Sequence, residues 1–279
     1  MEQSKIKNFK KIIWILWYQG WANAPKIILE CKDSWIEKNP DWEVRLLDKN
    51  SIDSYKEIKK CKRLFNNLSI AHISDLIRLS LLEKNGGVWV DASLFCIIPL
   101  EKWIFEYLDT GLFLFESDTN LTIIANWFIA SEKNHITIKR LKEKLILFWS
   151  NNNFGKINIF KKMIRRIITP FFNYNKLTSR LWFNPFFIKT FKIYPYQVFY
   201  FLFENIVRKE LKHKEIWNKT PKLNKYICWP YQDPSEKPSY DLKLRIKKQF
   251  VPMLKLKWRG SYPKEFEENS LVFYLKKIS

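Results

Sequence analysis

The amino-acid sequence predicts an α/β protein built around a Rossmann-like sheet. Segments with strand propensity alternate with segments of helical periodicity through residues 1–150, an alternation typical of such sheets. One expected helix is followed by two adjacent glycines and then by a short apolar strand, a pattern that marks a helix end and a tight turn. No G-x-G-x-x-G motif follows the first expected strand, which argues against a dinucleotide-dependent enzyme of the usual kind.

Propensity, periodicity and capping residues place the expected elements in chain order. Residues 11–16 and 43–47 are rich in apolar side chains with strand propensity. The helix at 25–38 begins at Pro25, which the first helical turn tolerates, and the apolar residues of 70–84 fit a buried helix. We further expect helix and turn at 48–64, strands at 88–90, 111–116 and 123–130, and a helix at 134–149 capped by Asn134.

Residues 74–93 (SDLIRLSLLEKNGGVWVDAS) place candidate functional residues around the end of one strand. Asp91 falls where that strand ends, and ligands of open α/β sheets bind outside the carboxyl ends of strands. A carboxylate there, close to the small residue Ser93, can hold a divalent cation against a diphosphate. Asp75 and Arg78 are three residues apart, so they share one helix face and can reach Asp91. The alternative for an aspartate after a strand is a turn former or a helix cap.

These residues belong to a longer pattern that resembles a family of sugar transferases. S-D-x-x-R followed by G-G-V-W-V-D-A-S is similar to the capsular polysaccharide synthesis glycosyltransferases, and to the wider family-32-like transferases and glucosylating clostridial toxins. KIIWILWYQGW near the N-terminus and NWFIAS at 126–131 match the same pattern in the same order. The resemblance is best over residues 10–150. It implies a GT-A-type fold and a hexosyltransferase-like activity.

The metal site that the resemblance implies centres on Asp91. In the family the signature is Asp-x-Asp, whereas the second position here is Ser93, and a neutral hydroxyl binds a cation more weakly than a carboxylate. Asp91, helped by Ser93, would hold Mn2+ or Mg2+ on the donor's diphosphate. Such a metal stabilises the charge that develops on the departing nucleotide diphosphate.

The resemblance also implies roles in binding the donor and the acceptor. Trp14 would stack on the uracil base of the donor; the alternative is that this tryptophan of the first strand is a core residue. Asp75 and Arg78 would hold hydroxyl groups of the donor sugar. Asn126 would point at the acceptor or at the donor sugar, unless it is a turn residue.

The segment 253–259 (MLKLKWR) alternates like a strand and places Lys255, Lys257 and Arg259 on one face. Such cations can meet a diphosphate, and Lys255 is our candidate for donor binding. The alternative is an exposed edge strand whose lysines prevent aggregation.

Positive charge is concentrated in the second half of the chain. The 279 residues carry a net charge of +21, of which residues 1–150 account for +3 and residues 151–279 for +18. We therefore expect a nucleotide-sugar-binding core over 1–150. Continuous with it, 151–279 would form a helical, basic and aromatic-rich part that faces the acceptor or a membrane. A basic region of this kind implies an anionic partner.

Residues 144–203 contain ten Lys and Arg, eighteen aromatic residues and no acidic residue. Within them, 157–169 predicts an amphipathic helix of the type that lies in a membrane interface. Its apolar side chains form one stripe, and its basic residues fall on the other side: Lys161, Lys162, Arg165 and Arg166. The alternative is a core-facing helix with a solvated basic face. We expect contact with an anionic membrane surface.

Cysteine usage and the N-terminal residues indicate a cytoplasmic protein. The four cysteines are scattered without a C-x-x-C pair, which argues against a zinc site and is typical of buried thiols in a reducing compartment. The apolar run at 12–17 is too short for the core of a signal peptide or for a membrane span. The expected location is a bacterial cytoplasm, peripheral at the inner face of the cell membrane.

These observations predict a glycosyltransferase that moves a sugar from a nucleotide-diphosphate donor, a UDP-sugar, to a surface or capsular polysaccharide precursor. The acceptor would be a glycan or a lipid-linked glycan. Two other classes stay open. Basic residues interleaved with aromatics also hold single-stranded nucleic acids, although no RNP-type signature is present and we expect no nucleic-acid partner. The substitution at Ser93 is also compatible with a non-catalytic peripheral membrane protein that contains a decayed transferase domain.

Overall fold

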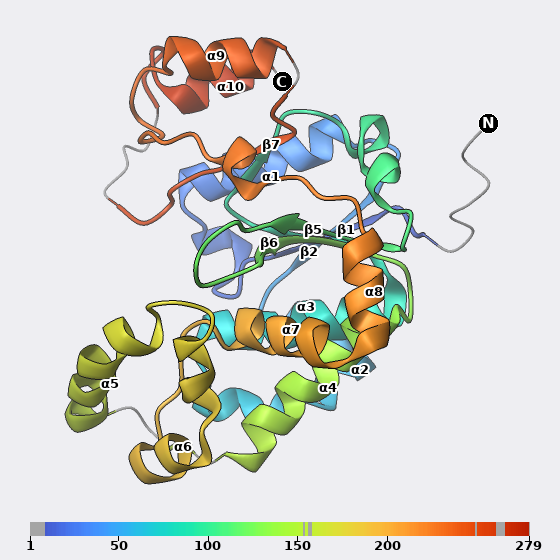
Figure 1. Cartoon of the computed structure of the whole chain (residues 1–279). Coiled ribbons are helices and arrows are strands. Elements are labelled where there is room, and N and C mark those ends of the chain that lie inside the picture. The colour runs from blue at the N-terminus through green and yellow to red at the C-terminus, as the bar shows by residue number, and fades with distance from the viewer. Residues whose placement is uncertain (1–8, 153, 156–157, 249, 261–265, 279) are drawn as a thin grey trace.

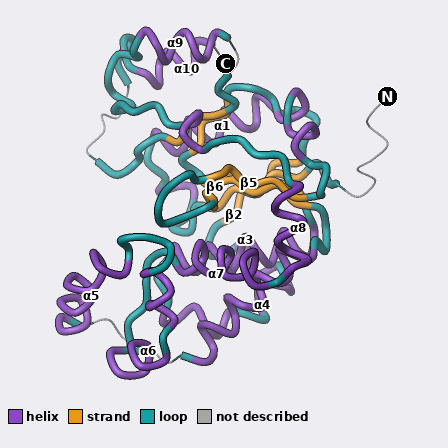
Figure 2. The backbone as a smooth tube through the Cα atoms, in the orientation of Figure 1, coloured by secondary structure: helices purple, strands orange, loops and turns teal. Residues whose placement is uncertain are grey.

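A five-stranded mixed sheet lies at the centre of the protein in the computed structural model, which describes residues 9–152, 154–155, 158–248, 250–260 and 266–278. In the order β2-β1-β3-β6-β5, β1 pairs in parallel with β2 and β3, and β6 pairs antiparallel with β3 and β5. The strands are β1 (Ile12–Leu16), β2 (Glu43–Leu47), β3 (Gly87–Asp91), β5 (Leu112–Glu116) and β6 (Ile124–Ser131). The predicted α/β fold class is confirmed (Figures 1 and 2).

Helices cover the sheet on both faces, so its central strands are buried on both sides (Figure 1). Side chains alternate along β1: Ile13 and Ile15 enter one apolar core and Trp14 enters the other. The core that holds Trp14 is closed by α3 (Ile70–Asn85), α4 (Ile136–Asn151), α7 (Val198–Lys209) and α8 (Leu211–Lys219). The opposite core is closed by α1 (Lys26–Lys38), α9 (Tyr240–Lys247) and α10 (Leu271–Ile278). A short helix, α2 (Lys56–Lys59), packs beside α3.

Two glycines carry the chain from α3 directly into β3. Gly86 and Gly87 have φ angles of 74° and 96°, which side-chain-bearing residues rarely adopt. A Cβ on Gly87 would lie 2.5 Å from the carbonyl oxygen of Ile12, and one on Gly86 would lie 2.7 Å from the backbone nitrogen of Lys133. The predicted helix stop is therefore confirmed, and the absent side chains also allow β3 to lie close to β1.

The last part of the chain returns to the sheet through a two-stranded ladder. β7 (Met253–Lys255) pairs antiparallel with β4 (Leu94–Cys96), and Leu94 is the register partner of Lys255. One further backbone bond, from the Leu256 N–H to the Ser93 carbonyl, measures 2.9 Å. The strand predicted over 253–259 is thus confirmed for its first three residues only.

A separate helical lobe lies beside the layer of α3, α4 and α7 (lower left in Figure 1). It contains α5 (Ile159–Phe172), a 3-10 turn at Thr178–Phe183 and α6 (Pro185–Phe191). Four side chains form its small core, namely Phe172, Trp182, Ile193 and Phe201. Among the described residues, no helix is both long enough and apolar enough to cross a membrane.

Most of the other predicted elements lie within two residues of their expected bounds. The helix expected at 157–169 is α5, which ends three residues later at Phe172, and residue 157 lies outside the described residues. The helix and turn expected at 48–64 continue to Asn67, and one predicted cap is wrong. The helix expected at 134–149 is α4, and its N-cap is His135, whose Nδ1 accepts a hydrogen bond from the Thr137 N–H at 3.3 Å. Asn134 lies one residue earlier with a φ of 60°. Asparagine tolerates this left-handed conformation better than most residues, so Asn134 forms the turn before the helix.

Candidate active site

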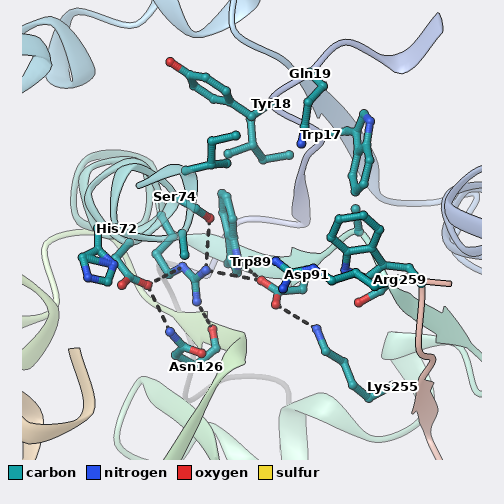
Figure 3. A pocket seen from close by; sticks show the side chains of 18 of the residues that line it. Trp17, Tyr18, Gln19, His72, Ser74, Trp89, Asp91, Asn126, Lys255 and Arg259 are labelled. Carbon is teal, nitrogen blue, oxygen red and sulfur yellow. Dashed lines mark hydrogen bonds and ion pairs between the residues drawn. The ribbon is translucent and has the colours of Figure 1, made fainter. Parts of the chain in front are cut away.

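A pocket opens where β1 and β3 end (Figure 3). Leu16 and Asp91 are register partners in the parallel pair of these strands, so the loop that follows β1 leaves the sheet beside Asp91. Because β6 runs antiparallel to β3, its first half, which includes Asn126, reaches the same edge. The side chains that line the pocket include Trp17, Tyr18, Gln19, His72, Ser74, Asp75, Arg78, Trp89, Asp91, Ser93, Asn126, Tyr196, Tyr200, Lys255, Trp258 and Arg259.

Asp91 accepts contacts from two cations and one indole. Its Oδ2 accepts a hydrogen bond from Lys255 Nζ at 2.8 Å, and its Oδ1 lies 3.3 Å from Arg78 Nη2 and 3.1 Å from Trp89 Nε1. Burial by itself would raise the pKa of Asp91, but Lys255 and Arg78 outweigh that effect and hold the pKa below its usual value. The carboxylate is therefore ionised at neutral pH.

Arg78 joins the two carboxylates of the site. Its side chain is only 5% exposed, and its Nε lies 3.6 Å from Oδ1 of Asp75, one helical turn earlier. Nη2 donates to Ser74 Oγ at 3.1 Å, and Nη1 donates to the backbone carbonyl of Asn126. The guanidinium also lies 5.0 Å above the ring of Trp89. These contacts orient Arg78 from several directions, as a binding site requires.

Asp75 is buried at the base of the pocket and is held by amide and guanidinium groups. Asn126 Nδ2 donates to its Oδ1 at 3.0 Å, while Oδ1 of Asn126 accepts from the hydroxyl of Tyr200. Burial, helped by the negative charge of Asp91, raises the pKa of Asp75 to about 7 in spite of Arg78. Asp75 is therefore poised between a proton donor and a proton acceptor near neutral pH.

The pocket carries more positive than negative charge. Arg78, Lys255 and Arg259 are its cations, and Asp91 is the carboxylate that stays fully ionised at neutral pH. His72, whose pKa falls to about 4 through burial and the proximity of Arg165, adds no charge there. An anionic ligand suits such a pocket.

The structure brings six of the seven predicted site residues together. The set that lines the pocket is Asp75, Arg78, Asp91, Ser93, Asn126 and Lys255, and the roles expected for these residues stay predictions. The seventh, Trp14, is completely buried inside the core beneath α3, and its Nε1 donates to the Gly86 carbonyl at 3.0 Å. The prediction that Trp14 stacks on a base is therefore wrong for this structure, because no face of its ring is accessible.

Other aromatic residues line the pocket where Trp14 does not. Trp17 and Tyr18 follow β1, and Trp258 lies edge-on to Trp17 with ring centroids 5.1 Å apart. Tyr200 from α7 and His72 from α3 complete the opposite side. None of these residues was predicted from the sequence, because one aromatic residue among many gives no sign of facing a pocket.

The donor atoms around Asp91 fit a resident metal ion poorly. Both carboxylate oxygens already contact cations, so a divalent ion there would have to displace the ammonium group of Lys255 while Arg78 remains close. Ser93 supplies only a hydroxyl, and the described part of the chain contains no group of three or more His, Cys, Asp or Glu side chains able to hold a metal. The expected Mn2+ or Mg2+ stays a prediction, and this arrangement argues against it.

Comparison with known proteins gives one family match and several partial relatives. A family model described as "Capsular polysaccharide synthesis protein" matches residues 1–177. The O-glycosyltransferase braB of Annulohypoxylon truncatum is 27% identical over 158 residues, which are 50% of this chain and 38% of that protein. The initiation-specific alpha-1,6-mannosyltransferase of Candida albicans is 26% identical over 106 residues, 35% of this chain and 28% of that protein. These alignments span well under half the length of the curated relatives.

Two solved structures are similar over larger parts of the chain. The PaToxG glycosyltransferase has a TM-score of 0.39 at 13% identity, covering 88% of this chain and 86% of that one. The catalytic domain of alpha-toxin from Clostridium novyi has a TM-score of 0.35 at 12% identity, covering 64% of each chain.

Proposed function

Because the chain belongs to the capsular polysaccharide synthesis protein family, as its sequence resemblance predicts, we propose that it is a GT-A-type glycosyltransferase with a nucleotide-diphosphate sugar as donor. The observation that carries the proposal is the arrangement of Arg78, which bridges Asp75 and Asp91 at the carboxyl end of β3. The partial relatives, described as glycosyltransferases, support the same reaction class.

The diphosphate of the donor would lie against Lys255 and Arg259. Lys255 Nζ is 2.8 Å from Asp91, and Arg259 lines the same pocket with its guanidinium 5.0 Å from the ring of Trp258. A phosphate oxygen can take over part of the contact that Lys255 makes with Asp91. Charge-assisted hydrogen bonds to phosphate are about twice as strong as neutral ones.

Lys255 would also act on the leaving group. When the sugar is transferred, the bond from its anomeric carbon to the diphosphate breaks and negative charge grows on the diphosphate oxygen. A divalent ion stabilises that charge in metal-dependent enzymes. We propose that the ammonium of Lys255, together with Arg78, supplies the stabilising charge here, because these groups already surround the carboxylate that would hold a metal.

The donor sugar would lie between Asp75, Asn126 and Tyr200. The carboxylate, amide and phenol form one chain of hydrogen bonds at the base of the pocket, and sugar hydroxyls can both donate to and accept from these groups. The base of the nucleotide would lie against Tyr18 and Trp17, which take the place expected for Trp14. A UDP-sugar remains the proposed donor.

The proposed acceptor is a glycan or a lipid-linked glycan of a surface-polysaccharide pathway. The family description supports the pathway, and two aromatic rings that line the pocket, Tyr196 and Trp258, are suited to stack on sugar rings. An acceptor hydroxyl held beside these rings would form its bond to the anomeric carbon as the bond to the diphosphate breaks, and its proton would pass to the departing diphosphate.

A donor panel tests the proposal. The purified protein is incubated with UDP-, GDP- and other nucleotide sugars, and thermal protection and release of the free nucleotide are measured for each. We expect at least one donor to stabilise the protein and to be turned over, and we expect Asp91→Asn to lose turnover of that donor. If no nucleotide sugar protects the protein, or if Asp91→Asn turns over donor like the wild type, the assignment fails.

A further inference from the structure

The helical lobe exposes apolar side chains along one side of α5. Ile164, Ile168 and Phe172 follow one another at four-residue spacing and pack on the lobe's small core. A second row on the same helix, here called the outer stripe, has no such cover. It consists of Phe160, Met163, Ile167 and Phe171, which are 54% to 71% exposed.

Further apolar side chains of the lobe are exposed as well. Phe186 of α6 is also exposed; it contacts Phe187, which in turn packs on Phe172 at the end of α5. The other exposed apolar residues of the lobe are Ile159, Tyr174, Leu177 and Leu181. Soluble proteins rarely expose this many large apolar side chains on one small lobe unless they meet a partner or a membrane.

The four basic residues of α5 divide into two pairs. Lys161 donates to the Phe154 carbonyl at 2.6 Å, and Arg165 lies 6.0 Å from the ring of Tyr194, so this pair faces the body of the protein. Lys162 and Arg166 lie one helical turn apart and are exposed beside the outer stripe. Of the four basic residues expected on the side opposite the apolar stripe, Lys162 and Arg166 are therefore the pair exposed to an external surface.

Residues 144–203 contain no Asp or Glu, and among the described residues neither Lys162 nor Arg166 forms an ion pair with a carboxylate. An apolar row flanked by uncompensated cations is complementary to a surface with acyl chains below and anionic head groups above. A stacking surface for nucleic acid would need cations that track a backbone along a groove, whereas the outer stripe is a continuous apolar row with its cations on one flank. The charge pattern thus favours a lipid surface.

We propose that the outer stripe, with Lys162 and Arg166 beside it, docks the protein onto an anionic lipid surface. Phe160, Met163 and Ile167 insert among the acyl chains, while the two cations contact the head groups. The docking does not depend on the chemistry of the pocket, so it stands or falls separately from the proposed transferase activity.

The inner side of α5, opposite its exposed cations, is connected to the pocket through aromatic contacts. Arg165 of α5 lies over Tyr194, and the Tyr194 ring is 5.3 Å from that of His72, which lines the pocket. The helix that carries the outer stripe therefore lies close to one wall of the pocket. This position suits an acceptor that is anchored in the lipid.

Co-flotation with lipid vesicles tests the docking surface. The full chain is mixed with vesicles of phosphatidylcholine alone or of phosphatidylcholine with phosphatidylglycerol, and the bound fraction is measured at low and at raised salt. We expect binding to the anionic vesicles, weakened but not abolished by salt, because the apolar insertion is not screened.

Two double variants separate the contributions of charge and apolar insertion. Lys162→Glu with Arg166→Glu should weaken partitioning to anionic vesicles roughly tenfold or more. Phe160→Ser with Ile167→Ser should abolish the binding that survives raised salt. The matched control, Lys212→Glu with Lys214→Glu on α8, makes the same charge change on exposed residues outside the lobe and should bind like the wild type.

All these side chains are exposed, so the variants should have the same melting temperature as the wild type. A thermal melt of each variant would reveal any loss of folding. Equal losses in the control and the α5 charge variant would overturn the proposal, because total charge would then explain the binding. Wild type that fails to float, or that floats equally with neutral and anionic vesicles, would also overturn it. The proposal would likewise be overturned if the wild type does not float with vesicles but binds single-stranded RNA in a salt-sensitive manner.

Discussion

Asp91 and Lys255 are separated by 164 residues in the chain, yet their charged groups form a 2.8 Å contact at the centre of the pocket. The contact depends on the pairing of β4 with β7, which sets Lys255 opposite Leu94, three residues after Asp91. It places a positive charge where the signature of the family would place a metal.

Replacing Lys255 by Met should lower kcat/KM for the donor by roughly 10- to 150-fold, because one charge-assisted contact to the diphosphate is lost. The matched control is Lys257→Met, which removes an exposed lysine that lies two residues further along and outside the pocket. Both are measured by initial rates of nucleotide release.

The same assay tests whether a metal is needed. Wild-type turnover should persist in excess chelator if Lys255 supplies the charge. Complete loss in chelator, restored by Mn2+ or Mg2+, would return the site to a metal-dependent mechanism and would leave the transferase assignment intact.

Asp75→Asn should change the dependence of stability on pH. The pKa of Asp75 is raised to about 7 in the folded protein, so between pH 4 and pH 7 the unfolded chain ionises this group while the folded protein keeps it protonated. Ionisation then favours unfolding, and the wild type loses stability over that range.

The variant lacks this loss, so its melting temperature relative to wild type should rise from pH 4 to pH 7 and then level off. The gain is bounded at roughly 4 kcal/mol, because the raised pKa of Asp75 disfavours its ionised form in the folded protein by about that much. Thermal melts at several pH values measure it, and a difference between the two proteins that stays constant from pH 4 to pH 8 would contradict the raised pKa.

Arg78→Met should destabilise the protein by about 3–5 kcal/mol, because it removes the central partner from a buried set of charges. Arg63→Met, at an exposed position, is the control and should change the free energy of unfolding by less than about 0.5 kcal/mol. Urea denaturation measures both. If the Arg78→Met protein is as stable as the control, the guanidinium of Arg78 is not needed to stabilise the buried carboxylates of Asp75 and Asp91.

Tyr18→Ala should weaken donor affinity by roughly 5- to 150-fold if its ring carries the base, since stacking on an aromatic side chain is worth about 1–3 kcal/mol. Trp14→Phe should do the reverse: donor affinity stays unchanged while stability falls, because Trp14 fills the core and donates to Gly86. Nucleotide titrations measure the donor affinity of both variants, and thermal melts measure their stability. Reduced donor affinity of a folded Trp14→Phe protein would reinstate the original assignment.

The sequence was most informative where function depends on neighbouring residues. Asp75, Arg78 and Asp91 lie within one helix, turn and strand, so periodicity and the glycine pair are enough to bring them to one edge. The prediction for Trp14 was wrong for a physical reason. Because β1 is buried on both faces, every residue of the strand is apolar, and the sequence of the strand cannot show which side chain lies near a pocket.

Contacts from distant segments were harder to anticipate. Lys255 was a candidate on charge alone, but its position beside Asp91 depends on a strand pairing across most of the chain. Tyr200 reaches Asn126 from α7, within a stretch so rich in aromatic residues that none stands out. Helix caps were similarly ambiguous, since Asn134 and His135 are adjacent and both can accept a hydrogen bond.

The late position of β7 has a consequence for how the protein is made. Chains emerge from the ribosome N-terminus first, so β1, α3 and β3 can assemble long before β7 exists. Until then the carboxylate of Asp91 lacks Lys255, and the edge of β4 has no partner strand. Nascent chains arrested before residue 255 should therefore contain the sheet but no competent pocket, and ligand binding should be gained in a single late step of synthesis.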